Sequence, residues 1–303
     1  MIYFPVRNVF VEGPDCSGKT TLINSIHKET HYKWHLFDRS QISRGIFASM
    51  YDRKLPFASL HEREEINDLN NLYIFLVPDW MTIKTRFLLR GDDIHDIHSL
   101  RRVYDLFETK LGSVKEHPNI KDFSGIPPDD LPAFAIDAIE NLEKMSLDEI
   151  SSYVYLFCQA QPGGEAISLS FSLVDDGNFE CASSSILDHE GESEYYRRIR
   201  SKMLDKIVSE FAGENEYKKP QNIFSRRFIH TENTCISMIH ALYRENVLEV
   251  NFNVRSTNVE KTFPYDLKFA YFLSSEIYKQ LGLVPGTNAC VVRFILNSAH
   301  IVW

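Results

Sequence analysis

A glycine-rich segment near the N-terminus has the residue types that hold phosphate groups. Residues 13–20 read Gly-Pro-Asp-Cys-Ser-Gly-Lys-Thr and fit the pattern GxxxxGK[ST] at every fixed position. In this pattern the glycines let backbone N–H groups surround phosphate oxygens, while the lysine reaches the β- and γ-phosphates and the threonine hydroxyl binds Mg²⁺. The alternative is a chance match on a turn. We expect this segment to bind ATP through Gly13, Ser17, Gly18, Lys19, Thr20 and Thr21.

A second set of reactive and charged residues lies between positions 225 and 301. It combines one thiol, Cys235, with guanidinium groups, a carboxylate and an imidazole; the other members are Arg226, Arg227, Arg255, Ser256, Asp266 and His300. A thiolate near arginines has a lowered pKa, and the thiolate is the nucleophilic form. The set therefore offers a soft nucleophile, phosphate-binding groups and partners for polar edges of a ligand. Taken singly, a cysteine is more often a buried apolar residue.

The elements around residues 13–20 predict an α/β fold. Apolar runs at 8–11, 35–37 and 73–77 alternate with helix-forming sequence at 19–27 and 57–70, and 112–133 is rich in Gly and Pro and reads as a loop. Strands and helices that alternate in this way form a parallel sheet with helices on both faces. Ligands of such sheets bind at the carboxyl ends of the strands, where Gly13, Asp38 and Asp79 would lie.

The pattern changes near residue 150, where we place a domain boundary between 1–150 and 151–303. Segments 166–173 and 247–254 alternate apolar and polar residues, which predicts antiparallel strands with one buried face. Residues 194–211 and 266–281 predict two long helices, and 236–243 also reads as helical. The second domain is therefore expected to be α+β.

Composition narrows the classes of protein. The net charge of -9 argues against a protein that coats nucleic acid, because such a protein needs a basic face. Five scattered cysteines without a CxxC pair are typical of a reducing compartment rather than of a disulfide framework or a zinc site. No signal stretch opens the chain and no apolar run approaches about 18 residues, so we expect a cytoplasmic protein without a membrane span.

The N-terminal motif resembles the opening of thymidylate kinases and related deoxynucleoside monophosphate kinases, over roughly residues 1–146. The resemblance rests on residues 11–21, on Asp38-Arg39-Ser40 and on 86–92. It implies that Asp15 contacts the acceptor sugar, that Arg39 holds the acceptor phosphate, and that Asp38 organises that phosphate or the Mg²⁺ bound by Thr20. Arg86 and Arg90 would be lid arginines that neutralise the transferring phosphoryl group. The alternatives are a surface ion pair at Asp38–Arg39 and a solvated helix face at Arg86 and Arg90.

The C-terminal set resembles the thymidylate synthase family, including the deoxycytidylate hydroxymethylases. The resemblance rests on Ser-Arg-Arg at 225–227 and on the separation of Cys235 from Arg255-Ser256. It implies that the thiol of Cys235 adds to C6 of a pyrimidine, that C5 then reacts with a one-carbon unit from methylenetetrahydrofolate, and that Arg255 and Ser256 bind the nucleotide phosphate. Arg226 and Arg227 would serve the partner subunit of a homodimer, and His300 would meet the sugar hydroxyl.

Within this resemblance, Asp266 favours dCMP over dUMP, because a carboxyl accepts from the exocyclic amine of cytosine. The alternative is a helix N-cap. Asn258 and Val302 depart from the family's usual aspartate and tyrosine. The sequence does not identify the family's proton-relay glutamate; the candidates are Glu165 and Glu194.

These patterns together predict a bifunctional enzyme of nucleotide metabolism, which acts on small-molecule nucleotides. One domain would be a deoxynucleoside monophosphate kinase that uses ATP and Mg²⁺, and the other would modify C5 of a pyrimidine nucleotide. Two alternatives stay open: a kinase with a non-catalytic sensor or dimerisation domain, and a regulatory ATPase whose hydrolysis drives a conformational switch.

Overall fold

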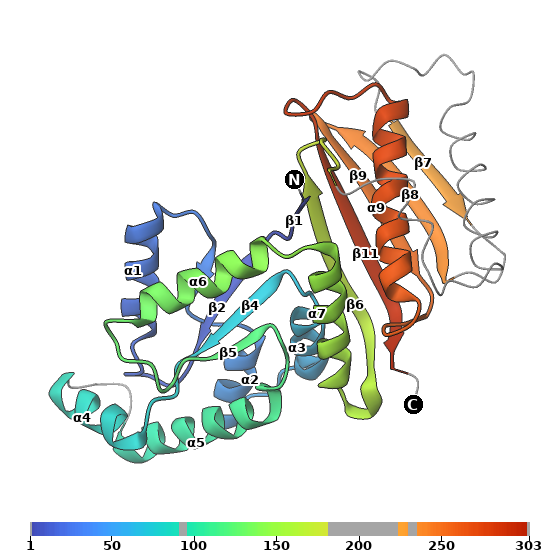
Figure 1. Ribbon diagram of the computed structural model, residues 1–303. Coiled ribbons are helices and arrows are strands. Elements are labelled where there is room, and N and C mark those ends of the chain that lie inside the picture. The colour runs from blue at the N-terminus through green and yellow to red at the C-terminus, as the bar shows by residue number, and fades with distance from the viewer. Residues whose placement is uncertain (1, 91–95, 181–223, 230–234, 302–303) are drawn as a thin grey trace. The chain divides into compact units, whose positions relative to one another are not determined.

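The chain divides into two compact units. The computed structural model describes residues 2–90, 96–180, 224–229 and 235–301. The N-terminal unit comprises Val6–Glu143, and the C-terminal unit comprises Lys144–Trp303 together with Met1–Pro5. Both units contain a sheet and helices, so the α/β class is confirmed in general terms (Figure 1).

The N-terminal unit is built on a four-stranded parallel sheet. Its order is β3 (Leu36–Phe37), β2 (Asn8–Glu12), β4 (Asn71–Phe75) and β5 (Ile120–Asp122). Every residue of β4 is buried, as expected for a parallel strand that is covered on both faces. The helices are α1 (Lys19–Thr30), α2 (Gln41–Met50), α3 (Ala58–Ile66), α4 (Trp80–Arg90), α5 (Ile97–Val114) and α6 (Leu131–Glu143). Helix α1 packs against α6, and α2 packs against α3 and α5 (Figure 1).

Two sequence predictions for this unit were wrong in extent. The helix expected at 57–70 covers only Ala58–Ile66. The segment 112–133, expected to be a loop, contains the end of α5, strand β5 and the start of α6. Strand β5 forms through pairing with β4, where Tyr73 is opposite Ile120, and local composition carries no signal of that partner. Pro132 lies in the first turn of α6, where a missing backbone N–H costs nothing.

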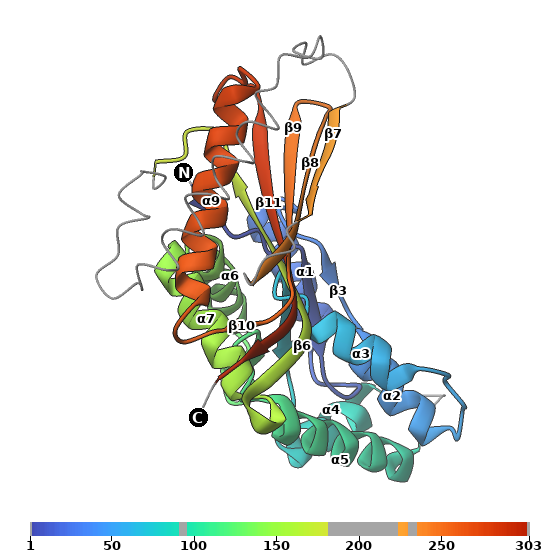
Figure 2. The ribbon, with the colours of Figure 1, turned by 90° about the vertical axis from the view of Figure 1, so that its right-hand side faces the viewer.

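The C-terminal unit is a mixed sheet with two helices, α7 (Leu147–Gln159) and α9 (Phe263–Gln280), on one face (Figures 1 and 2). A 3₁₀ turn, Pro162–Gly164, follows α7. The order along the sheet is β1 (Ile2–Tyr3), β6 (Glu165–Asp175), β11 (Ala289–His300), β9 (Val247–Val254), β8 (Ile236–Arg244) and β7 (Phe224–Ile229). The short strand β10 (Thr257–Asn258) pairs with the end of β11. Strands β6 and β9 and helix α9 confirm three predicted elements.

Other expectations for this unit need correction. Strands β9 and β11 run parallel, so the sheet is mixed and not antiparallel throughout. Segment 236–243, expected to be helical, is strand β8. A register irregularity between Ile236 and Met238 buries Ile236 and Ile239, which are three residues apart, and this spacing imitates a helix. The alternation of buried Ala241 and Tyr243 further along is that of a strand. The predicted helix at 194–211 lies outside the described residues.

Aromatic side chains form the core of the C-terminal unit. Phe294 of β11 stacks on Phe171 of β6 at 4.8 Å and on Phe252 of β9 at 5.5 Å between ring centroids. Phe263 of α9 meets Phe171 and Phe294 edge-on. This cluster fixes α9 on the sheet. Among the helices described in either unit, none is long and apolar enough to cross a membrane.

Candidate functional site

The glycine-rich loop, residues 13–20, connects the buried strand β2 to α1 at the carboxyl edge of the parallel sheet. Gly13 has φ +149°, and a Cβ atom there would lie 2.1 Å from the carbonyl oxygen of Leu76. Gly18, the N-cap of α1, has φ +107°. Both positions require glycine, since a side chain is strained at these φ values and has no room at Gly13. The fixed glycines of the motif are therefore needed by the backbone itself.

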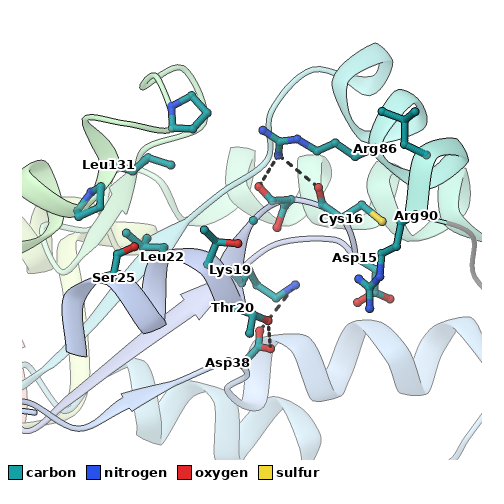
Figure 3. Close-up of a pocket in the computed structure, with 16 residues that line it drawn as sticks. Asp15, Cys16, Lys19, Thr20, Leu22, Ser25, Asp38, Arg86, Arg90 and Leu131 are labelled. Carbon is teal, nitrogen blue, oxygen red and sulfur yellow. Dashed lines mark hydrogen bonds and ion pairs between the residues drawn. The ribbon is translucent and has the colours of Figure 1, made fainter. Parts of the chain in front are cut away.

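Lys19 lies across the inside of this loop. Its Nζ donates to the carbonyl oxygens of Gly13 at 2.9 Å and Pro14 at 3.0 Å. The same Nζ lies 3.8 Å from Oδ1 of Asp38 (Figure 3). Burial lowers the pKa of Lys19, and the charges of Asp38 and Asp15 oppose that shift. The loop thus holds a largely buried ammonium group at the point where the motif requires a cation for phosphate.

Ser17 provides a second sign that the loop is built for a ligand. Its side chain is buried, and its hydroxyl has no hydrogen-bond partner within the described part of the chain. A buried hydroxyl without a partner costs free energy that a ligand atom can recover. Ser17 also lines a cavity, described below, so such a ligand has room.

The segment after β3 brings Asp38 and Arg39 to the same loop. The hydroxyl of Thr20 donates to Oδ2 of Asp38 at 3.4 Å, and Arg39 lies 4.0 Å from a carboxylate oxygen of Asp15. The guanidinium of Arg39 also lies 4.5 Å from the centre of the Phe47 ring. Arg39 therefore faces Asp15 of the loop. The oxygens of Thr20 and Asp38 suit Mg²⁺, which prefers hard oxygen ligands.

Helix α4 contributes the two predicted lid arginines. Nη1 of Arg86 donates to the carbonyl oxygens of Ser17 at 2.9 Å and Cys16 at 3.3 Å, so this residue contacts the loop directly (Figure 3). Arg90 is exposed, one turn further along, and lines the same cavity together with Leu89. Arg86 thus contacts the loop, and Arg90 lines the same cavity.

A cavity of about 710 Å³ joins these residues. One part is polar and charged, with Asp15, Lys19, Asp38, Arg86 and Arg90. The other has an apolar wall from α1, the turn before α6 and the first residues of α6, formed by Leu22, Pro128, Leu131 and Pro132. A second cavity of about 290 Å³ adjoins it at the ends of β4 and β5 and shares Ser17 and Arg86. Sequence reasoning missed the apolar wall, because it assigned 128–132 to a loop.

Glu12, which sequence reasoning also missed, lies directly behind the loop. It is 0% exposed, and its carboxylate accepts from the backbone N–H of Ser40 at 2.7 Å and from the hydroxyl of Ser43. Burial raises the pKa of Glu12, and the hydrogen bonds from Ser40 and Ser43 and the charge of Lys19 act in the opposite direction. The sequence signal for this residue was a carboxylate at the end of the apolar run 9–11.

In the C-terminal unit, part of the predicted second set converges at one end of the sheet. The hydroxyl of Ser256 lies 3.5 Å from Nδ1 of His300, and the backbone N–H of Arg255 donates to the carbonyl of Cys235 at 2.8 Å. Asp266 is 2% exposed and accepts from the hydroxyl of Thr257 at 3.2 Å. The N-cap of α9 is Thr262, so the alternative of Asp266 as an N-cap was wrong.

Two other members of that set, Arg226 and Arg227, lie further along the sheet, whereas the candidate glutamate Glu165 lies beside His300. In β7, Arg226 pairs with Ala241 and Arg227 with His240, so Arg226 is five residues along β8 from Ile236, or roughly 17 Å. Glu165 is exposed and accepts from the hydroxyl of Ser298 at 2.6 Å, and that hydroxyl lies 3.5 Å from Nδ1 of His300. Glu194 and Val302 lie outside the described residues.

The chain matches no protein-family model, and no curated protein matches it significantly.

Proposed function

We propose that the N-terminal unit is a phosphotransferase that moves a phosphoryl group from ATP to a deoxynucleoside monophosphate. The observation that carries the proposal is the convergence of Lys19, Arg86 and Arg90 on one cavity beside the buried hydroxyl of Ser17, which has no hydrogen-bond partner among the described residues. Such a cavity accepts an anion with several negative oxygens. Its position at the carboxyl edge of a parallel sheet is the usual place for a ligand.

The donor nucleotide would bind along α1. Backbone N–H groups of the glycine-rich loop and the ammonium of Lys19 would hold its phosphates, and the base would lie on the apolar wall at Leu22 and Leu131. Thr20 and Asp38 would hold Mg²⁺, which neutralises charge on the phosphates when it is bound. The two side chains already lie within 3.4 Å of one another, so little rearrangement is needed.

The acceptor would bind on the side of Asp15 and Arg39. Arg39 would hold the acceptor phosphate, and Asp15 would accept from a sugar hydroxyl. Arg86 and Arg90 would then face the transferring group from α4. Phosphoryl transfer needs little covalent help from the protein, so positioning by these cations accounts for most of the expected rate.

A survey of the deoxynucleoside monophosphates with ATP and Mg²⁺ tests this proposal. We expect a deoxynucleoside diphosphate from at least one of them, and loss of this product in Lys19→Ala. Lys28→Ala is the matched control, because Lys28 is an exposed lysine on the same helix. Hydrolysis of ATP without any diphosphate product would instead favour a regulatory ATPase that acts as a switch.

For the C-terminal unit we propose binding of a pyrimidine deoxynucleotide, with C5 chemistry that uses methylenetetrahydrofolate. The adjacency of Ser256 to His300, next to the strand end that carries Cys235, supports this assignment. Tritium release from C5-labelled dCMP and dUMP, with Cys235→Ala as the control, tests it. The absence of release from both substrates would leave a sensor or dimerisation domain.

The same proposal includes a homodimer. Arg226 and Arg227 of β7 pair with Ala241 and His240, which lie along β8 away from Cys235, so the two arginines would act on the partner subunit's site. Light scattering that gives a monomer mass at all concentrations would contradict it.

A further inference from the structure

Glu12 connects the end of β2 to the beginning of α2. One carboxylate oxygen accepts from the backbone N–H of Ser40 at 2.7 Å, and the other accepts from the hydroxyl of Ser43. Ser40 is the N-cap of α2, and its own hydroxyl accepts from the N–H of Ile42 at 3.0 Å. Glu12 therefore holds a helix start that is already capped by its own side chain.

Glu65 of α3 likewise accepts a hydrogen bond from the backbone of the next residue, Gln41. Its Oε1 accepts from the backbone N–H of Gln41 at 3.2 Å and from the hydroxyl of Tyr73 at 3.0 Å. Burial raises the pKa of Glu65, as it does that of Glu12. Two carboxylates from different elements thus accept from consecutive N–H groups at one helix N-terminus, where negative charge is stabilised by the helix dipole.

These contacts matter for the residues that come just before α2. Asp38 and Arg39 have side chains that are 48% and 58% exposed, so their own side-chain contacts fix them only in part. Strand β3 pairs with β2 only through Leu36 and Phe37. The backbone of Asp38-Arg39 is therefore held by a two-residue strand on one side and by the start of α2 on the other.

We propose that Glu12 and Glu65 are positioning residues, which hold Ser40 and Gln41 and thereby set Asp38 and Arg39 against the glycine-rich loop. The inference rests on the proposed function, since it gives Arg39 the acceptor phosphate. Glu12 is fully buried and Glu65 partly buried, which makes the charged form of each costly, and each accepts from a backbone N–H at the start of the same helix. The pair therefore fixes the backbone of Ser40 and Gln41, directly after Asp38 and Arg39.

Steady-state kinetics of Glu12→Ala and Glu65→Ala test this role. We expect the KM for the deoxynucleoside monophosphate to rise about tenfold in each, as for loss of a hydrogen bond to a charged group, with a smaller rise in the KM for ATP, because Asp38 is displaced as well. Glu12→Gln and Glu65→Gln keep an acceptor oxygen and should restore most of the acceptor affinity. Folded Ala variants with an unchanged acceptor KM would overturn the proposal.

The matched control is Glu143→Ala. Glu143 is also buried, at 4% exposed, and accepts from Nε1 of Trp34 at 2.7 Å and from Lys33 at 3.1 Å in the same unit. It does not line the cavity of about 710 Å³. Its loss should lower stability without changing either KM. An equal rise of the acceptor KM in this control would mean that any buried carboxylate matters, which overturns a specific role for Glu12 and Glu65.

Hydrogen exchange separates this inference from the proposed function. In nucleotide-free protein, the amides of Ser40 and Gln41 should exchange about tenfold faster in the respective Ala variant, whether or not the enzyme phosphorylates the nucleotides offered. Wild-type exchange rates in both variants would sink the positioning role even if the kinase is active. Where Glu12→Ala does not fold, Glu65→Ala alone decides the result.

Discussion

Replacing Gly13 by alanine is expected to damage both the fold and the site. A Cβ atom at this position would lie 2.1 Å from the carbonyl oxygen of Leu76, so the end of β2 and the residue after β4 would have to separate by at least 0.9 Å to restore a contact of 3.0 Å. The N–H of Leu76 donates to the carbonyl of Glu12 at 2.8 Å, and that separation would break this hydrogen bond. The φ of +149° adds backbone strain.

The expected loss is several kcal/mol. Strain at such a φ costs about 1–3 kcal/mol, and overpacking against a backbone atom that cannot rotate away costs roughly 1–3 kcal/mol more. We therefore expect Gly13→Ala to lower the free energy of unfolding of the N-terminal unit by about 2–6 kcal/mol. Denaturant unfolding, followed by circular dichroism, measures this difference, and calorimetric titration with ATP measures the accompanying loss of binding.

Gly112→Ala is the matched control. Gly112 lies inside α5, and a Cβ atom there meets nothing within 4 Å. The same chemical change should stabilise the unit by about 0.5–1 kcal/mol, because alanine favours a helix over glycine. The reasoning is refuted if Gly13→Ala unfolds within about 0.5 kcal/mol of the wild type, which is the range of an ordinary surface change.

Three further outcomes follow from single contacts. Glu12→Gln should become more stable relative to the wild type as pH rises above the unfolded pKa of about 4.5, because burial raises the folded pKa of Glu12 and makes its ionised form costly. A difference in unfolding free energy between the two proteins that stays flat from about pH 4.5 to 8 would contradict this. Arg86→Ala should lower kcat for phosphate transfer about 10²-fold or more, because it removes a hydrogen-bond donor to the charge that develops in the transition state. The KM for ATP should change less. An unchanged rate of phosphate transfer in single-turnover measurements would show that Arg86 is not part of the site. Phe294→Ala should destabilise the C-terminal unit by about 3–5 kcal/mol and leave ATP binding unchanged, and a change below 1 kcal/mol in denaturant unfolding would show that the aromatic cluster is not its core.

The sequence predicts the glycine-rich loop well because that loop depends on consecutive residues. Gly13, Lys19 and Thr20 are close in the chain, and their conformations follow from local rules. Glu12 and Glu65 were missed because their partners Ser40 and Gln41 are 28 and 24 residues away, and only the folded chain brings them together.

The largest error, at 236–243, has a similar cause. The irregularity after Ile236 replaces a spacing of two with a spacing of three, so local periodicity indicates a helix while pairing with β7 and β9 imposes a strand. The residues 2–3 are another case, because β1 pairs with Val174 and Asp175 at the far end of β6. No local pattern reports a partner that is more than 170 positions away.

The place of β11 in its sheet has a consequence for synthesis on the ribosome. This strand lies between β6 and β9, yet it is the last strand of the unit to be translated. Until Ala289–His300 leaves the exit tunnel, β6 and β9 expose open backbone edges and the faces of Phe171 and Phe252 lack their stacking partner. Open edges with apolar faces are templates for aggregation. The N-terminal unit differs in this respect, because all of its described strands precede residue 123. A nascent chain therefore completes one unit long before the other, and a chain cut short before β11 is a substrate for chaperones and proteases.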